Sequence, residues 1–292
     1  MKLPETTVIG LGALGMALVK ALSSRDIPVK SIFNRTPEKV RTLSRQLDIP
    51  ISGAFPEDSS QLGELVFITV PDGAINEVAE RLSHLKGDFE GRFYVHCSGN
   101  ESANLLNPLA EKGGRTASFH PLQTFTPQSG PESFNGIYFS LQGDEEVFPI
   151  IENIAKIFDA HSFRITARQK PYLHAAAVMA SNYLYTLLDA SAGIGALGGL
   201  PESQLQQALL PLIQTTLENA EGMSFAEALS GPIKRGDLGT VQKHLELLRD
   251  HQKLRRPYCE LGLQTIDLAQ SSGSLDGTTA EKLRKILNDK NG

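Results

Sequence analysis

Three glycines close to the N-terminus constrain the fold of this chain more than any other feature. They occur in GLGALG at 10–15, directly after the apolar segment TTVI at 6–9 and directly before a helix-like segment. In a strand–turn–helix unit, the first glycine permits a tight turn, the second leaves room for a pyrophosphate and the third lets helix and strand pack closely. The free amides at the helix N-terminus favour an anion at the same place. The sequence therefore predicts a dinucleotide-binding turn, rather than a purely structural one, made of Gly10, Leu11, Gly12, Ala13, Leu14 and Gly15.

The residues that follow the second strand-like segment indicate which nucleotide is bound. This segment, at 29–34, ends in Asn34, and Arg35 and Thr36 follow it. An NAD-binding chain carries an acidic residue here, which binds the ribose hydroxyls, and none of these three residues is acidic. Arg35 and, one helical turn later, Lys39 can instead bind a 2′-phosphate, with Asn34 and Thr36 as hydrogen-bond donors. The spacing favours NADP over NAD, although a solvated helix start capped by Thr36 would explain the same residues.

Strand-like and helix-like segments alternate over about the first 165 residues. Such alternation is typical of an α/β fold with a doubly wound parallel sheet, whose strands are apolar on both faces. Beyond it the strand signals stop, and a long apolar helix is predicted over 169–197, followed by further helices. We expect a Rossmann domain at 1–166 and an all-helical domain at 167–292. The predicted strands are 6–9, 29–34, 65–70, 92–97, 115–119, 136–141 and 161–166.

Two groups of residues close predicted strands and are expected to line the ligand site. In open α/β sheets, ligands lie outside the carboxyl ends of the strands. Val70, Pro71 and Asp72 close one strand and are expected to contact the cofactor. Ser98 and Gly99 follow the next strand along the chain and are expected to contact the substrate.

Three other side chains lie near these strand ends. His96 is a candidate by position only. Cys97 is either a reactive thiol or a small apolar residue at a buried strand end. His120, in SFHPLQTF at 118–125, can bind a carboxylate or donate a proton near neutral pH, and it can equally be a local structural hydrogen-bonding group.

Polar residues form a stripe along the long apolar helix. At about 100° per residue, Lys170, His174, Ala177 and Ser181 fall within a sector of about 60°, and Asn182 follows directly after Ser181. Polar groups in so apolar a helix need partners, which a cleft at the nucleotide would provide. We expect Lys170 or His174 to protonate a substrate oxygen and Asn182 to orient the substrate. A polar seam that faces solvent or the other domain is the alternative.

A turn rich in glycine and basic residues occurs in LSGPIKRGDLGTVQKH at 229–244. Arg235 is suited to bidentate binding of a substrate carboxylate. Asp237 can cap the following helix, which carries His244, and both are further candidates for the substrate site. Ordinary turn chemistry between helices explains the same residues.

Composition and charge exclude several classes of function. A formal net charge of −5, with no run of Lys and Arg, gives no positive field for nucleic acid or an anionic membrane. No apolar run is long enough to span a bilayer, and the N-terminus lacks the pattern of a signal peptide, so we expect a cytoplasmic protein. Two cysteines are too few for a disulfide framework or a metal site, and we expect no metal.

Taken together, these motifs resemble a family provisionally classed as NADP oxidoreductases, in which a Rossmann domain precedes a helical domain of unknown function. That family is distantly similar to ketopantoate reductase, to 3-hydroxyisobutyrate and 6-phosphogluconate dehydrogenases and to pyrroline-5-carboxylate reductase. The resemblance implies a C-terminal domain like that of 6-phosphogluconate dehydrogenase and a homodimer built through it. The motifs that carry it are GLGALG, NRT at 34–36, VPD at 70–72, HCSG at 96–99, SFHPLQTF, HAAAVMASN at 174–182 and SGPIKRGDLGT with His244.

The resemblance also bears on the proton donor. In the related dehydrogenases, a Lys and, four residues later, an Asn face the substrate. Lys170 matches the Lys, but the fourth position holds His174, and the nearest Asn is Asn182. Lys170 and His174 therefore both stay candidates.

The hypothesis that follows is an NADPH-dependent reductase of a small 2-oxo acid, first of all one of the ketopantoate type. An imine reductase is the alternative enzyme. A sensor or scaffold that binds NADP without turnover is an alternative of a different class.

Overall fold

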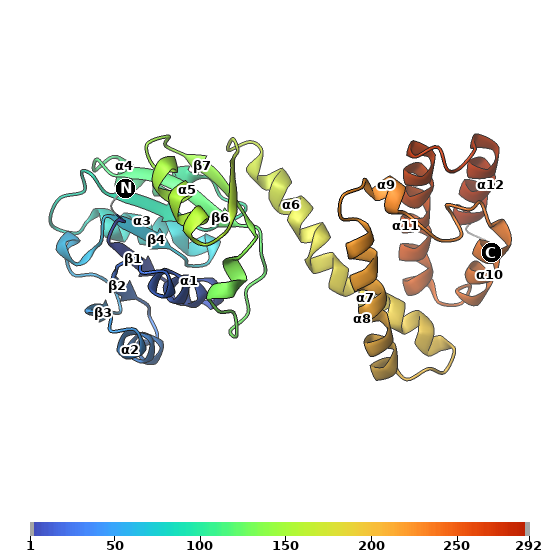
Figure 1. The fold of residues 1–292 in the computed structure, drawn as a ribbon, viewed down its shortest axis with the longest axis horizontal. Helices are drawn as coiled ribbons and strands as arrows, with labels where there is room; N and C mark the ends of the chain where they lie inside the picture. The colour runs from blue at the N-terminus through green and yellow to red at the C-terminus, as the bar shows by residue number, and fades with distance from the viewer. Residues whose placement is uncertain (1–2, 290–292) are drawn as a thin grey trace. The chain divides into compact units, whose positions relative to one another are not determined.

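A computed structural model describes residues 3–289 of the chain. By their contacts the residues divide into two compact units, Met1–Ser181 and Asn182–Gly292, and each is described by itself (Figure 1). None of the helices among the described residues is long and apolar enough to cross a membrane. The predicted boundary between the nucleotide-binding and substrate domains, at 166, stays a prediction. By packing contacts, the first unit extends to Ser181.

The described part of the first unit is built around a sheet of eight strands in the order β3-β2-β1-β4-β5-β6-β7-β8. Neighbouring strands are parallel, except that β7 runs antiparallel to β6. The order of β1 to β6 is that of a doubly wound nucleotide-binding sheet, which reverses between β1 and β4. The strands are β1 (Thr6–Ile9), β2 (Val29–Phe33), β3 (Ile51–Gly53), β4 (Leu65–Ile68), β5 (Phe93–His96), β6 (Arg115–Pro121), β7 (Tyr138–Gly143) and β8 (His161–Arg164).

Helices cover both faces of this sheet, as the apolar character of its strands predicts. α1 and α5 contribute to the core on one face, whereas α3 and α4 contribute to the core on the other. α6 follows β8 and begins at Lys170. The helices are α1 (Ala13–Ser24), α2 (Pro37–Gln46), α3 (Ile75–Ser83), α4 (Asn107–Ala110), α5 (Phe148–Ile157) and α6 (Lys170–Ala180), with short 3-10 turns η1 (Ser59–Gln61), η2 (Asp72–Ala74), η3 (Ala103–Leu106) and η4 (Pro131–Phe134).

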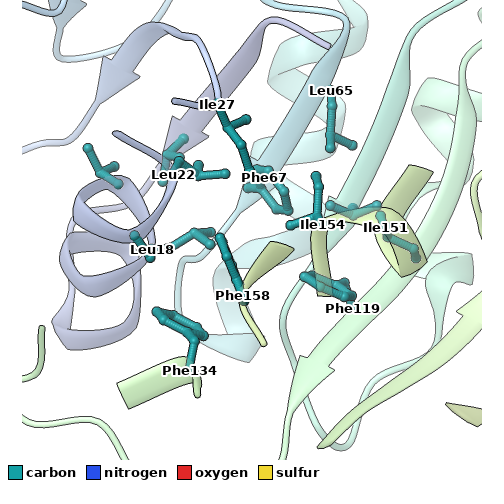
Figure 2. Close-up of a cluster of buried hydrophobic side chains, with 14 of the residues drawn as sticks. Leu18, Leu22, Ile27, Leu65, Phe67, Phe119, Phe134, Ile151, Ile154 and Phe158 are labelled. Atoms are coloured by element: carbon teal, nitrogen blue, oxygen red, sulfur yellow. The ribbon is translucent and has the colours of Figure 1, made fainter. Parts of the chain in front are cut away.

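An aromatic core fixes the middle of the sheet. Figure 2 shows Leu18 and Leu22 of α1 in one cluster with Phe67 of β4 and Phe119 of β6. The ring of Phe119 stacks on that of Phe139 in β7, with the two centroids 4.0 Å apart. Each such side chain contributes about 1.5–3 kcal/mol when it is fully buried. The carboxyl ends of β4, β5 and β6, where a ligand site is expected, are therefore held by a rigid core.

Three features refine or correct the sequence-based expectation. β3 was not predicted, because its three residues are only half-buried or exposed and form no apolar run. The direction of β7 was not predicted either, because the alternation of a strand does not reveal which way it runs. The helix predicted over 169–197 is broken at Ser181, where φ is −114° and ψ is −67°. Ser181 and Asn182 are weaker helix formers than the alanines before them.

The described part of the second unit is helical throughout. Its core lies among α10, α11 and α12 and contains Val241, Ile266 and Leu283. α7 and α8 pack on each other, but α8 buries none of its residues and α7 buries only Ala192. The helices are α7 (Asn182–Leu197), α8 (Glu202–Asn219), α9 (Phe225–Ala228), α10 (Leu238–Leu247), α11 (Gln252–Ser271) and α12 (Gly277–Leu287).

Candidate functional site

The glycine turn has the geometry that an anion-binding turn requires. Gly10 has a φ of 102°, and a Cβ there would lie 2.9 Å from the carbonyl of Thr69. A Cβ on Gly15 would overlap the carbonyl oxygen of Gly10, whereas a Cβ on Gly12 would meet nothing within 4 Å. Gly12 is the N-cap of α1 and offers no side chain, so no side-chain cap occupies the first amides of the helix. The turn therefore leaves space and free donors for a pyrophosphate.

Thr69, which sequence reasoning missed, holds this turn in place. Its hydroxyl donates to the carbonyl oxygen of Gly10 at 2.6 Å. β4 ends at Ile68, so the predicted contacts Val70 and Pro71 lie in the loop after it and Asp72 begins η2. Val70 is half-buried, and Pro71 and Asp72 are exposed.

The residues after β2 lie beside the glycine turn. The side-chain oxygen of Asn34 accepts a hydrogen bond from the Leu11 amide at 3.0 Å, and Lys39 Nζ donates to the Leu11 carbonyl at 3.5 Å. Arg35 and Thr36 are exposed. Asn34 therefore positions the turn, Lys39 contacts it, and Arg35 follows Asn34 in the chain. This arrangement fits a nucleotide with a phosphate on its ribose.

Lys170 is the most unusual charged residue among those described. Only 1% of its surface is exposed, and its Nζ donates to the carbonyl oxygen of Ser98 at 2.7 Å. Burial lowers the pKa of Lys170 from 10.5 to about 8, against the opposing influence of Cys97, Asp72 and Glu101. A group that is protonated at neutral pH and loses its proton readily is suited to acid catalysis.

The loop that carries the Ser98 carbonyl is fixed by its own hydrogen bonds. The Ser98 hydroxyl accepts from the amides of Asn100 and Glu101 at 3.2 and 3.0 Å. Ser118 on β6 donates to the Ser98 carbonyl at 3.4 Å. The buried Gln142 on β7 accepts from the Ala103 amide at 2.8 Å. Ser118 and Gln142 were not predicted, and polar residues within apolar strands were the signal that could have indicated them.

Two of the predicted histidines meet at Gly99. His120 lies at the end of β6 and His174 one turn into α6, with ring centroids 6.3 Å apart. A Cβ on Gly99 would lie 2.7 Å from His120 Nε2 and 2.7 Å from His174 Nδ1. The other nitrogen of His120 lies 3.4 Å from the Ser140 hydroxyl. Burial, followed by the charges of Lys170, His174 and His96, lowers the pKa of His120 to about 3.

His96 and Cys97 are buried beneath this loop. His96 Nδ1 accepts from the Ser98 amide at 3.2 Å, which leaves the proton on Nε2. Burial and then the Lys170 charge lower the pKa of His96 to about 4. Burial raises the pKa of Cys97 to about 12, so its thiol stays protonated and the packing role is the one that the structure supports.

The structure brings Ser98, Gly99, His120, Lys170 and His174 together in the first unit. The other residues predicted for catalysis or substrate binding belong to the second unit, where Asn182 and Arg235 are exposed. Asp237 caps α10 by accepting hydrogen bonds from the Thr240 hydroxyl at 2.7 Å and from the Thr240 amide at 3.0 Å, and these two bonds lower the pKa of Asp237. His244 Nδ1 lies 2.8 Å from the Tyr258 hydroxyl. Over residues 3–289, no group of His, Cys, Asp or Glu is arranged to hold a metal ion.

A doubly wound sheet with a glycine turn at its first strand defines a Rossmann-like domain, and residues 3–121 match the family of that description, "Rossmann-like domain". Residues 137–265 match a second family, "Domain of unknown function (DUF2520)". The two matches together describe a Rossmann-like domain followed by a DUF2520 domain. This confirms the predicted fold class of a Rossmann sheet followed by a helical region, and the resemblance to a family with a helical domain of unknown function.

Solved structures of similar fold include a Bacteroides fragilis protein provisionally named NADP oxidoreductase BF3122, with 23% identity, a TM-score of 0.72 and coverage of 91% of this chain and 98% of that one. Protein TM1727 of Thermotoga maritima has 28% identity, a TM-score of 0.64 and coverage of 97% and 98%. The 1-pyrroline-5-carboxylate reductase of Streptococcus pyogenes has 18% identity, a TM-score of 0.60 and coverage of 97% and 98%. No curated protein matches this chain with significance.

Proposed function

We propose that this protein is an NADP-dependent oxidoreductase that reduces a small carbonyl substrate, first of all a 2-oxo acid of the ketopantoate type. The observation that carries the proposal is the buried ammonium of Lys170, held by the Ser98 carbonyl in the same unit as the glycine turn. The similar proteins named for NADP and for reductase activity support the same class of reaction. The reaction would take place in the cytoplasm, without nucleic acid or membrane partners.

The cofactor would be held by the turn from Gly10 to Gly15 and by the cations of Arg35 and Lys39. NADPH, when bound, supplies the hydride. Arg35 is exposed and makes no hydrogen bond within the described residues that would prevent it from binding a 2′-phosphate. The expected consequence is a preference for NADPH over NADH that Arg35→Ala abolishes. Equal affinity for both nucleotides in the unaltered protein would contradict the assignment.

Lys170 would supply the proton that completes reduction. As the carbonyl carbon gains hydride, the N–H bond of the Lys170 ammonium breaks and an O–H bond forms on the substrate. The ketone becomes an alcohol, and the neutral amine regains a proton from solvent. Because the pKa of Lys170 is about 8, both forms are accessible near neutral pH. We propose His174 and His120 as supporting groups of this site.

The charge of Lys170 also distinguishes the two enzyme hypotheses. A protonated imine carries a positive charge, and a buried ammonium beside it repels that charge strongly where water is excluded. A 2-oxo acid carries a negative charge and is attracted instead. The fold shared with pyrroline-5-carboxylate reductase keeps imine reduction as the second candidate.

We also propose that Asn182, Arg235, Asp237 and His244 contribute to substrate binding.

A homodimer through the helical unit belongs to the same proposal. Exposed apolar side chains on α7 and α8 include Tyr185 and Leu210, which are 72% and 60% exposed. A cavity of about 310 Å³ lies between these helices and includes both side chains in its lining. Apolar surface of this kind marks an interaction site more often than a solvated face. Leu210→Asp is expected to shift the protein from dimer to monomer in light scattering, and a monomeric unaltered protein would refute the proposal.

NADPH oxidation over a panel of 2-oxo acids and cyclic imines tests the activity. Turnover of a 2-oxo acid that Lys170→Ala abolishes, while NADPH still binds, would support the carbonyl reductase. Turnover of imines alone would favour the second candidate. Tight NADPH binding without turnover of any compound would favour a sensor or scaffold. Arg235→Ala, with a raised KM and unchanged kcat, would identify the carboxylate anchor.

A further inference from the structure

We infer that Gly99 is a positioning residue. Because it has no side chain, the rings of His120 and His174 can pack against its α-carbon, and this packing keeps Lys170 on the Ser98 carbonyl. This inference rests on the proposed function and deepens it, because it assigns the geometry of the proton donor to a residue without a side chain. Sequence position suggested a different role for Gly99, namely contact with the substrate.

α6 contacts the loop after β5 at two successive points. Lys170 donates to the Ser98 carbonyl at 2.7 Å, and His174, one helical turn later, places Nδ1 against Gly99. Residues four apart lie on the same face of a helix, so the two contacts act together on the first turn of α6. A displacement of His174 therefore displaces Lys170 as well.

The obstacle to a side chain at Gly99 is the pair of imidazoles and not the backbone. Gly99 is buried and does not have a positive φ, so an alanine could adopt its conformation. Its Cβ would lie 2.7 Å from His120 Nε2, 2.8 Å from His120 Cε1 and 2.7 Å from His174 Nδ1. Contacts this short force at least one ring to move. His120 is tied to Ser140 on its far side, so the movement falls on His174 and α6.

One polar atom of this contact, the Nδ1 of His174, is buried and unpaired among the described residues. A buried nitrogen without a partner costs about 1–3 kcal/mol, so this position of the His174 ring is unfavourable by itself. The charged and titratable groups that influence Lys170 and the histidines are His96, Cys97, Asp72 and Glu101. None of these groups is removed by a change at Gly99, so an altered titration of Lys170 is expected to report its displacement.

The experiment compares Gly99→Ala with the unaltered protein in NADPH oxidation as a function of pH. We expect kcat to fall about 10²-fold, with NADPH affinity unchanged, because a misplaced donor costs that much. The alkaline limb of the profile, expected near pH 8, should move toward 10.5 as Lys170 gains water. Loss of folded protein would lower the rate without moving this limb. An unchanged kcat, or an unmoved limb in a variant that circular dichroism shows to be folded, would overturn the inference.

A double-mutant cycle and a control complete the test. Gly99→Ala and His174→Ala disturb the same contact, so the double variant should lose less than the product of the two single effects. Independent, multiplicative effects would contradict the inference. His174→Ala also tests the contact if Gly99→Ala fails to fold. Gly277→Ala is the matched control, since its Cβ meets nothing within 4 Å at the start of α12.

The titration of Lys170 can also be followed without turnover, through the ¹³C shift of its side chain in NMR. If the unaltered protein reduces no substrate but Gly99→Ala still raises the titration midpoint of Lys170, the proposed function fails and the positioning role stands. If turnover is present and Gly99→Ala leaves the midpoint unchanged, the positioning role fails and the function stands.

Discussion

Replacing Lys170 by methionine should make the first unit more stable at neutral pH while it removes the proposed activity. Lys170 is almost wholly buried, and its pKa falls from 10.5 to about 8 on folding. At about 1.4 kcal/mol per pH unit, this shift means that burying the ammonium costs about 3 kcal/mol. Methionine has a similar shape and no charge, so it does not incur this cost. The variant also loses the hydrogen bond to the Ser98 carbonyl. This loss reduces the gain in stability by about 1–3 kcal/mol, and it does not depend on pH in this range.

The pH dependence of the difference follows from the direction of the shift. The folded pKa lies below the unfolded one, so the cost of Lys170 is complete below pH 8 and disappears as pH rises toward 10.5. The advantage of Lys170→Met should therefore shrink by about 2 kcal/mol between pH 7 and 9.5. Lys112→Met, at an exposed lysine, should show no such trend.

Urea unfolding followed by near-ultraviolet circular dichroism measures this difference. The chain has no Trp, and the buried Tyr94 of β5 reports on the first unit. Burial raises the pKa of Tyr94, so its hydroxyl stays protonated across the range. A difference between Lys170→Met and the unaltered protein that stays constant from pH 7 to 9.5 would refute the reasoning.

Three further predictions concern the same unit. Acid should destabilise it, because the folded pKa values of His96 and His120 lie below the ordinary 6.5. The free energy of unfolding is therefore complete above pH 6.5 and falls by about 2 kcal/mol per imidazole at pH 5. His96→Gln should halve this loss, as measured by urea unfolding at pH 7 and pH 5. Gly15→Ala should weaken NADPH binding in calorimetry by at least about tenfold, because its Cβ overlaps the Gly10 carbonyl, and undiminished affinity would be inconsistent with the turn geometry. Phe158→Ala should cost about 3–5 kcal/mol in urea unfolding, because Phe158 is fully buried in the core of Figure 2, and a cost below about 1 kcal/mol would show that the site collapses.

The geometry of the glycine turn could be predicted from sequence because it is local. The turn from Gly10 to Gly15 depends on backbone shape, and the proposed cofactor contacts Arg35 and Lys39 depend on charge, both of which short motifs carry. Thr69 was missed because its contact with Gly10 joins two strands that are neighbours only in the folded sheet.

The acid–base half was predictable only as a set of candidates. Helical periodicity placed Lys170 and His174 on one face, and both do lie at the β5 loop. The polar stripe was also expected to include Asn182, because one continuous helix was predicted. Asn182 belongs to the second unit, beyond the break at Ser181. Periodicity describes a straight helix and cannot show where one ends inside an apolar segment.

The first turn of α6 belongs by its contacts to the first unit, although residues 137–265 match the DUF2520 family as one stretch. Lys170 is therefore held by the sheet, in the unit that contains the glycine turn, and not by the helical unit. A change of sequence in α7 to α12 would leave the contact between Lys170 and the Ser98 carbonyl in place. The proposed proton donor and the proposed hydride site are thus built as one piece.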